Sequence, residues 1–314
     1  MSPLPVCAAH ALEEKPPERR WLIESLWSAE AVGIVGGEPK CCKSFLALDM
    51  AVAVATGTPC LRHFPVPRAG PVLLFAAEDA LHIVRQRLDG ICRAAGTALA
   101  ELDVQVVTAP SVRLDLEQDR KALTETVAEL QPRLLILDPF VRLHRVDENV
   151  SGEVAPLLAF LRELQRRFQL AVVLVHHARK GAGKERAGQA LRGSSEFHAW
   201  GDSNLYLRRH DEHLALSIEH RAAPSQTGIS MELRAEGEAL ALAVSDAPAV
   251  APTAQQPPLS ERIRSALDGA DGPLTVAELQ RACRVRTSTL CEALAELAAA
   301  GQVQKADRGY QLNR

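Results

Sequence analysis

Short apolar runs alternate with longer amphipathic segments over the first two hundred residues of this 314-residue chain. The apolar runs are β-branched or leucine-rich, which is typical of strands buried on both faces of a parallel sheet. This alternation predicts a doubly wound α/β domain, with helices on both faces of a twisted, mostly parallel sheet. The expected strands are 31–35, 72–76, 104–108, 134–138 and 171–175, and the expected helices are 44–56, 80–95, 117–131 and 153–168.

After residue 200 the pattern changes to short strand-like segments joined by turns. The segments "SNLYLRR", "HLALSIEH", "ISMELR" and "ALALAV" predict antiparallel strands that extend the sheet. A stretch rich in Ala, Pro and Gln then lacks an apolar period, which is typical of a linker. The predicted organisation is a flexible polar arm over 1–20, the α/β domain over 21–245, the linker over 246–258 and a small domain over 259–314.

The small domain has the pattern of a winged helix-turn-helix. A helix over 260–268 precedes a second helix capped by Thr275, and a third begins at Thr287 and ends at Gly301. The segment "QVQKADRGYQL" then predicts a two-stranded wing. Basic and acidic residues nearly balance here, so the domain binds either DNA or a protein, with DNA favoured. The residues expected near DNA are Arg284, Arg286, Thr287, Ser288 and Thr289, with Lys305 and Arg308 on the wing.

The segment "GGEPKCCKS" at 36–44 has the features of a phosphate-binding loop. Such a loop needs a strand, a turn of exposed backbone N–H groups, a lysine, a hydroxyl for Mg²⁺ and a helix start. The strand at 31–35 precedes it, and a helix follows that Gly57 is expected to cap. The residues expected around ATP are Gly37, Pro39, Lys40, Cys41, Cys42, Lys43, Ser44 and Phe45.

Cys42 stands where a glycine usually precedes the lysine. We expect a right-handed backbone at Cys42, in which a Cβ is tolerated, and therefore a working loop rather than a degenerate one. The adjacent thiols of Cys41 and Cys42 either sense oxidation, beside Lys43 and a helix N-terminus, or serve simply as small residues in a tight turn. The second interpretation is favoured.

Three further strands end in polar residues. Asp138 follows "LLIL" and can hold Mg²⁺ opposite Ser44, or simply cap a helix. Glu78 follows "LLFAA" and is the first choice for polarising the water that attacks the γ-phosphate, with Asp79 in reserve and a capping role as the alternative for both. His176 and His177 follow "AVVLV", and we expect a γ-phosphate sensor there, with a structural role as the alternative and a metal site ranked last.

Together these motifs carry a resemblance. The segments "GGEPKCCKSFLALDMAVAVATG", "LLFAAEDA", "LLILDPFVRLHRVDENVSGEVAPLLAFL", "VVLVHHARKG" and "LRGSS" resemble the RepA-type hexameric helicases of broad-host-range plasmids, within the RecA-like ATPases. The resemblance covers roughly residues 20–235. It implies a RecA-like P-loop core, a hexameric ring with ATP at subunit interfaces, and single-stranded DNA in the channel. By position it assigns phosphate to Lys43, Mg²⁺ to Ser44 and Asp138, catalysis to Glu78 and sensing to His177.

An arginine finger is the residue that a neighbouring subunit inserts to stabilise transition-state charge. The position matching the plasmid helicase's finger holds Asp202. The segment "LSIEHRAAPSQTG" instead resembles the strand end of bacterial replicative ring helicases, where a K-x-R pair acts across the interface. Arg221 matches the arginine, while Glu219 replaces the lysine. Arg221 is therefore the expected finger, with Arg208 and Arg209 as alternatives and an ordinary surface position as the remaining interpretation.

The segment "ARKGAGKERAGQALR" at 178–192 directly follows the histidines and is basic and glycine-rich. We expect it to grip a DNA backbone, and a solvated loop is the alternative. The segment 141–153 is a candidate second DNA-facing loop. The expected DNA contacts in 178–192 are Arg179, Lys180, Lys184, Arg186 and Arg192.

Charge and cysteine content exclude several classes of protein. The net charge of −3 excludes a polycation, so nucleic-acid contacts must come from local patches. The seven cysteines show neither zinc-site spacing nor a disulfide framework, and no signal peptide or membrane span is evident, so a cytoplasmic protein is expected. The leading hypothesis is a DNA-stimulated ATPase motor, such as a ring helicase of a plasmid, phage or mobile element. A non-unwinding ATP switch that recruits partners on DNA is the alternative, and a DNA-binding protein with a dead ATP site is disfavoured.

Overall fold

A computed structural model shows two compact units, residues 1–249 and 250–314. It describes residues 5–12, 16, 20–177, 196–210, 213–237, 239–245, 259–270, 272–283, 285, 287–306 and 308–313. The expected basic segment 178–192, the linker 246–258, and Arg284 and Arg286 lie outside the described residues, as does the side chain of Ser288. Within the described part, no helix is long and apolar enough to cross a membrane.

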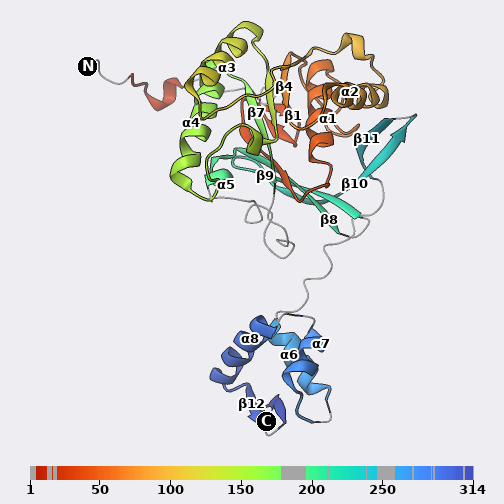
Figure 1. The fold of residues 1–314 in the computed structure, drawn as a ribbon, viewed down its shortest axis with the longest axis vertical. Coiled ribbons are helices and arrows are strands. Elements are labelled where there is room, and N and C mark those ends of the chain that lie inside the picture. The colour runs from red at the N-terminus through yellow and green to blue at the C-terminus, as the bar shows by residue number, and fades with distance from the viewer. Residues whose placement is uncertain are drawn as a thin grey trace. The chain divides into compact units, whose positions relative to one another are not determined.

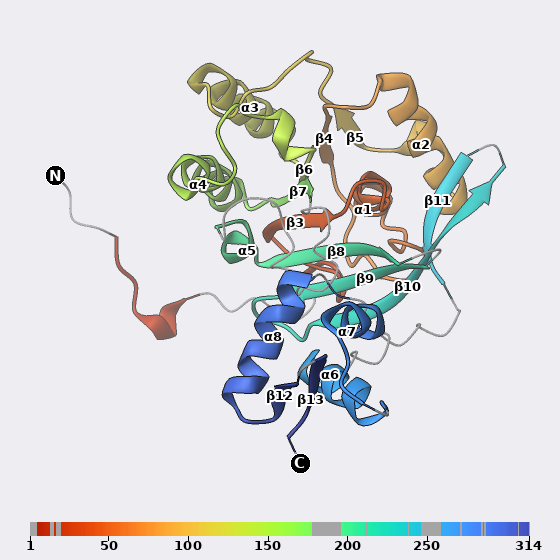
Figure 2. The ribbon, with the colours of Figure 1, turned by 60° about the horizontal axis from the view of Figure 1, so that its bottom comes forward.

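The larger unit, whose helices and strands are drawn in Figure 1, is built on a nine-stranded sheet. The order of its strands is β11-β10-β9-β8-β3-β7-β6-β4-β5, and Figure 2 labels each of them. The strands from β8 to β5 in that order run parallel. They are β3 (Val32–Gly37), β4 (Val72–Ala76), β5 (Val104–Val106), β6 (Leu134–Asp138), β7 (Ala171–His177) and β8 (Ser203–His210). The expected parallel sheet is therefore present, and β7 continues to His177 instead of ending at residue 175.

Beyond β8 the sheet continues in the antiparallel sense, as the alternating segments predicted. The added strands are β9 (His213–His220), β10 (Gln226–Glu236) and β11 (Ala239–Val244). A separate hairpin of β1 (Trp21–Ile23) and β2 (Trp27–Ser28) precedes β3, and the sequence did not predict it.

Helices cover both faces of the parallel strands. Alternate residues of one strand enter opposite cores: Val35 packs on the face of α1 and α2, and Ile34 on the face of α4. Figure 2 shows α1 and α2 on one side of the sheet and α3 and α4 on the other. Their bounds are α1 (Lys43–Thr56), α2 (Leu81–Ala94), α3 (Glu117–Leu130), α4 (Ser151–Phe168) and α5 (Glu196–Trp200), with short 3-10 turns at Ala9–Ala11, Leu99–Glu101 and Phe140–Arg142.

The smaller unit contains three helices followed by a β-hairpin. They are α6 (Leu259–Asp268), α7 (Val276–Cys283) and α8 (Thr287–Ala299), with β12 (Val303–Ala306) and β13 (Gly309–Leu312). Thr275 and Glu278 form a capping box, in which the Glu278 amide donates to Thr275 Oγ1 (3.3 Å) and the Thr275 amide donates to Glu278 Oε2 (2.8 Å). A single apolar core joins the helices to the hairpin. Thr287, Thr289, Lys305 and Arg308 are exposed.

Candidate active site

The phosphate-binding loop connects β3 to α1 at the carboxyl edge of the parallel strands. Its first residue, Gly37, has a φ of 155°, and a Cβ there would lie 2.3 Å from the carbonyl oxygen of Leu207. Only glycine therefore fits between the loop and β8. Pro39 and Lys40 are exposed, and Lys40 also has a positive φ of 64°. At the far end of α1, Gly57 is the expected left-handed cap, and its amide bonds the Ala53 carbonyl at 2.8 Å.

The expectation of a right-handed backbone at Cys42 is wrong. Cys42 is the N-cap residue of α1 and is left-handed, with φ 65° and ψ 23°. In that region a Cβ crowds the following carbonyl, which costs about 1–2 kcal/mol. Cys42 therefore adopts a backbone conformation that glycine would adopt without strain, and its Cβ makes the turn strained.

We predict that Cys42→Gly stabilises the protein. Removal of the Cβ should release about 1 kcal/mol of strain and raise the melting temperature by about 2–4 °C. Differential scanning fluorimetry measures this shift. Cys42→Ala is the control, because it removes the thiol but keeps a Cβ. An equal gain in both variants would place the cause in the thiol rather than in the backbone.

Lys43 is folded back over its own loop. Its ammonium donates a hydrogen bond to the Glu38 carbonyl (2.8 Å) and lies 3.8 Å from Cys41 Sγ, and the residue is only 5% exposed. Burial raises the pKa of the Cys41 thiol despite the nearby ammonium. A thiol that stays protonated is a poor nucleophile, which supports the favoured interpretation of Cys41 as a small residue in a tight turn.

Ser44 and Asp138 meet beside the loop. Burial raises the pKa of Asp138 to about 6, while a hydrogen bond from Ser44 opposes the shift. The carboxyls of Asp79 and Glu78 also raise this pKa, so acidic groups from two strand ends converge here. A hydroxyl and a buried carboxylate side by side suit Mg²⁺, whose charge would offset the cost of ionising Asp138.

We predict that Asp138→Asn stabilises the metal-free protein at neutral pH. The carboxyl of Asp138 has a pKa of about 6 in the folded chain against 3.8 as its ordinary value. The folded state therefore binds more protons than the unfolded state between about pH 4 and 6, so wild-type stability falls as pH rises through that window. Ionising a carboxyl with so high a pKa costs the folded state about 3 kcal/mol above pH 6. Urea unfolding with a chelator, repeated from pH 4 to 8, measures the gain.

Asp115 is the matched control for this prediction. A hydrogen bond from Arg113 lowers its pKa, so Asp115→Asn should lose stability at neutral pH instead of gaining it. If Asp138→Asn and wild type have the same free energy of unfolding at pH 8, burial of the Asp138 carboxylate does not destabilise the metal-free protein.

Glu78 and Asp79 follow β4 and have different partners. Glu78 is 44% exposed and accepts a hydrogen bond from Arg142 Nε at 2.9 Å. Asp79 forms an ion pair with Arg87, whose guanidinium lies 5.1 Å from the ring centroid of Phe45. Asp79 thus holds Arg87 of α2 against Phe45 of α1, whereas Glu78 remains open to solvent near Ser44 and Asp138.

The two histidines of β7 point to different surroundings. His177 lies opposite Gly37 in the parallel register, and its pKa is lowered by burial and then by Lys43, so the ring is neutral at pH 7. His176 is 1% exposed and stacks on Phe197, with ring centroids 4.4 Å apart. His177 therefore lies beside the phosphate-binding loop, where its role as a sensor stays a prediction, while His176 belongs to the core. Among the described residues no group of three or more His, Cys, Asp or Glu side chains is placed to hold a metal ion, so a metal here would rely on the pair of Ser44 and Asp138.

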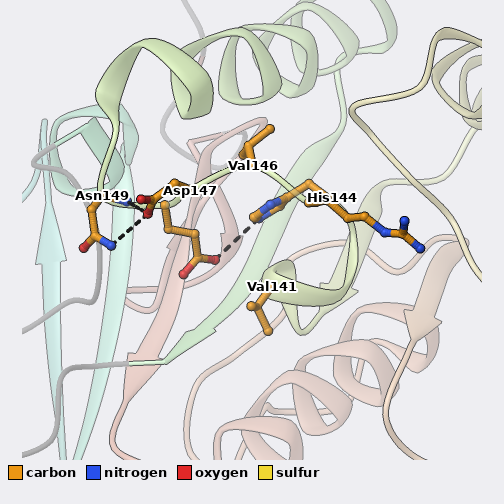
Figure 3. A pocket seen from close by; sticks show the side chains of 7 residues that line it. Val141, His144, Val146, Asp147 and Asn149 are labelled. Carbon is orange, nitrogen blue, oxygen red and sulfur yellow. Dashed lines mark hydrogen bonds and ion pairs between the residues drawn. The ribbon is translucent and has the colours of Figure 1, made fainter.

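Sequence reasoning missed a buried contact between the segment after Asp138 and β7. Glu148 Oε1 lies 3.4 Å from His144 Nε2 and 3.9 Å from His176 Nδ1. Figure 3 shows His144 and the neighbouring side chains around an open pocket of about 450 Å³. The pocket is lined by Val141, His144, Arg145, Val146, Asp147, Glu148 and Asn149. The spacing of His144 and Glu148, four residues apart, was the only hint in the sequence.

The expected finger, Arg221, lies far from its own loop. It follows β9, and its guanidinium bonds Asp202 Oδ1 at 3.2 Å and also the Ala199 carbonyl. The amide of Asp202 bonds the Val32 carbonyl at the opposite end of β3 from the loop. Arg221 is thus at the amino edge of the parallel strands, at the opposite edge from the phosphate-binding loop of its own chain. Its side chain is 56% exposed.

Comparison with solved structures shows the same fold in two proteins. A DnaB-like replicative helicase, solved in a study of its interactions with primase, superposes with a TM-score of 0.53 and 13% identity, covering 68% of this chain and 57% of its own length. A KaiC-like protein from Pyrococcus horikoshii superposes with a TM-score of 0.51 and 12% identity, covering 71% of this chain and 93% of its own. This chain thus spans little more than half of the helicase. The likeness establishes a RecA-like core.

A family profile described as an AAA domain matches residues 2–183. That region contains the phosphate-binding loop, Glu78, Asp138 and strand β7. The match spans more than half of the chain, so this protein belongs to the AAA domain family, whose members bind and hydrolyse ATP, typically with Mg²⁺.

Proposed function

We propose that the protein is an ATP-driven DNA motor that works as a hexameric ring, as a helicase or translocase in the replication or mobilisation of a plasmid, phage or mobile element. The observation that carries the proposal is the path of β7. Its last residue, His177, lies opposite Gly37 of the phosphate-binding loop, and the basic segment 178–192 begins at the next residue. If His177 senses the loss of the γ-phosphate, the change occurs at the residue directly before the candidate DNA-binding segment 178–192.

A second connection supports coupling between ATP and DNA. The segment 139–150 begins directly after Asp138 and contacts β7 through Glu148 and His176. The contact links the first candidate DNA-facing segment, 141–153, to β7, the strand that leads along the chain into the second candidate, 178–192. Arg221 supports assembly, because an arginine at the amino edge can complete an ATP site only in a neighbouring subunit.

The test measures ATP turnover, assembly and strand displacement on a forked duplex. We expect single-stranded DNA to stimulate turnover, a ring to be visible by electron microscopy with a non-hydrolysable ATP analogue, and the duplex to be unwound. Stimulation and assembly without strand displacement would favour the ATP switch. A wild-type protein that shows no response to DNA in any of the three measurements contradicts the proposal.

We predict that charge reversal at Lys180 and Lys184 removes DNA stimulation and leaves basal turnover unchanged. The reason is that a backbone grip depends on local positive charge, since the whole chain is slightly acidic. Reversal of Lys305 and Arg308 in the smaller unit is the control. If stimulation disappears only when 259–314 is deleted, the smaller unit couples DNA to ATP and the segment 178–192 does not.

A further inference from the structure

Strand β8 brings a cation, Arg209, to the phosphate-binding loop. Leu207 pairs with Gly37 in the parallel register, and its carbonyl oxygen lies where a Gly37 Cβ would clash. Figure 2 shows β8 beside β3 in the sheet. The backbone of β8 therefore packs directly against the entrance of the loop, and Arg209 follows two residues later.

The side-chain alternation of β8 places Arg209 on the face of α1. Leu205 and Leu207 pack in the core that contains α1, and Arg209 is the next residue of β8 on that face. Tyr206 packs in the core on the opposite face, and Arg208 is the next residue on that side. The contacts agree, because Arg209 Nη2 lies 3.7 Å from Cys42 Sγ. Arg209 thus reaches the N-cap of α1 within its own subunit.

Two other arginines near the site, in the part of the chain that the structure describes, are paired with acids. Arg87 is paired with Asp79, and Arg142 with Glu78. Arg209 is exposed, and within the described residues no carboxylate lies in ion-pair contact with it. The guanidinium of Arg209 therefore faces solvent beside the phosphate-binding loop, where it is available to bind an anion.

We propose that Arg209 binds a phosphate of the ATP held by its own subunit. The planar fork of a guanidinium matches phosphate oxygens and holds them by charge-assisted hydrogen bonds. Such an arginine would add a second cation to Lys43, at the loop residue where Cys42 replaces glycine. The inference deepens the ATP site on which the proposed function rests, and it removes Arg209 from the candidates for a finger supplied by a neighbour.

The first test is nucleotide affinity without DNA, by calorimetry with a non-hydrolysable ATP analogue and Mg²⁺. A lost charged hydrogen bond is worth about 1.5–3 kcal/mol, so Arg209→Ala should weaken binding by about 10–100-fold. Arg208→Ala, at the same strand end but on the other face, is the matched control and should bind as wild type does. Arg209→Lys should recover part of the affinity, because charge remains without the fork. Equal affinities for Arg209→Ala and wild type overturn the proposal, whether or not the protein responds to DNA.

The second test separates action within a subunit from action on a neighbour. Arg209→Ala is mixed with Lys43→Ala under conditions that exchange subunits, and turnover is measured. If Arg209 acts on its own loop, every site in the mixture lacks one of the two cations, and no activity returns. If it acts on a neighbour, some mixed interfaces hold both residues, and recovered turnover would overturn the proposal. The affinity measurement decides whether Arg209 binds phosphate, and the mixture decides in which subunit it does so.

Discussion

Glu78→Gln lowers ATP turnover by about 10²-fold or more and leaves ATP affinity nearly unchanged. The amide is isosteric with the carboxylate but cannot accept a proton from the attacking water, and loss of acid–base catalysis has this magnitude. Glu78 is chosen because it lies just after β4, is 44% exposed and contributes to the charge around Asp138. Single-turnover measurements with saturating ATP isolate the chemical step from binding.

Asp79→Asn is the control for this experiment. Asp79, just after β4, is paired with Arg87 of α2, so its loss should affect stability more than turnover. The same assay applied to Arg142→Ala tests whether the bond to Glu78 holds the carboxylate in a resting position. A 10²-fold loss in Asp79→Asn, with Glu78→Gln fully active, would transfer the catalytic role to Asp79.

The parallel core could be predicted because its strands are short, apolar and separated by helical segments of sufficient length. The strands at 72–76 and 134–138 have the expected bounds, since a polar residue or turn follows each apolar run directly. β7 was harder to delimit, because His176 and His177 are polar by type, although the first is buried in the core. The hairpin of β1 and β2 was missed, because strands this short carry no detectable period.

Those site residues could be predicted that belong to a short sequence motif or that directly follow a strand. Lys43, Ser44 and Asp138 followed from strand ends that a parallel sheet brings to one edge. The backbone of Cys42 was not predictable, because the side chain gives no sign of a left-handed turn. Nor were the approach of Arg209 to the loop and the contact of Glu148 with His176, since both join segments distant in sequence through packing alone.

Arg221→Ala should lower turnover by about 10³-fold or more in the assembled protein, with little change in ATP affinity. A finger stabilises charge that develops only in the transition state, and supplied arginines of this kind contribute about 10³–10⁵-fold. Arg221 lies at the opposite edge of the sheet from its own loop, so the effect requires an interface between subunits. Arg234→Ala, an exposed arginine on β10 paired with Glu232, is the control and should retain full turnover.

Mixing Arg221→Ala with Lys43→Ala then tests the interface directly. Some mixed interfaces pair an intact Lys43 with an intact Arg221, so part of the turnover should return, in contrast to the Arg209 mixture. The dependence of wild-type turnover on protein concentration is the second measurement, because a site completed by a neighbour loses activity on dilution. A monomer with full, concentration-independent turnover in the presence of DNA would contradict both the finger and the ring. In that case Arg221 would serve only to hold Asp202 and the Ala199 carbonyl at the amino edge of the sheet.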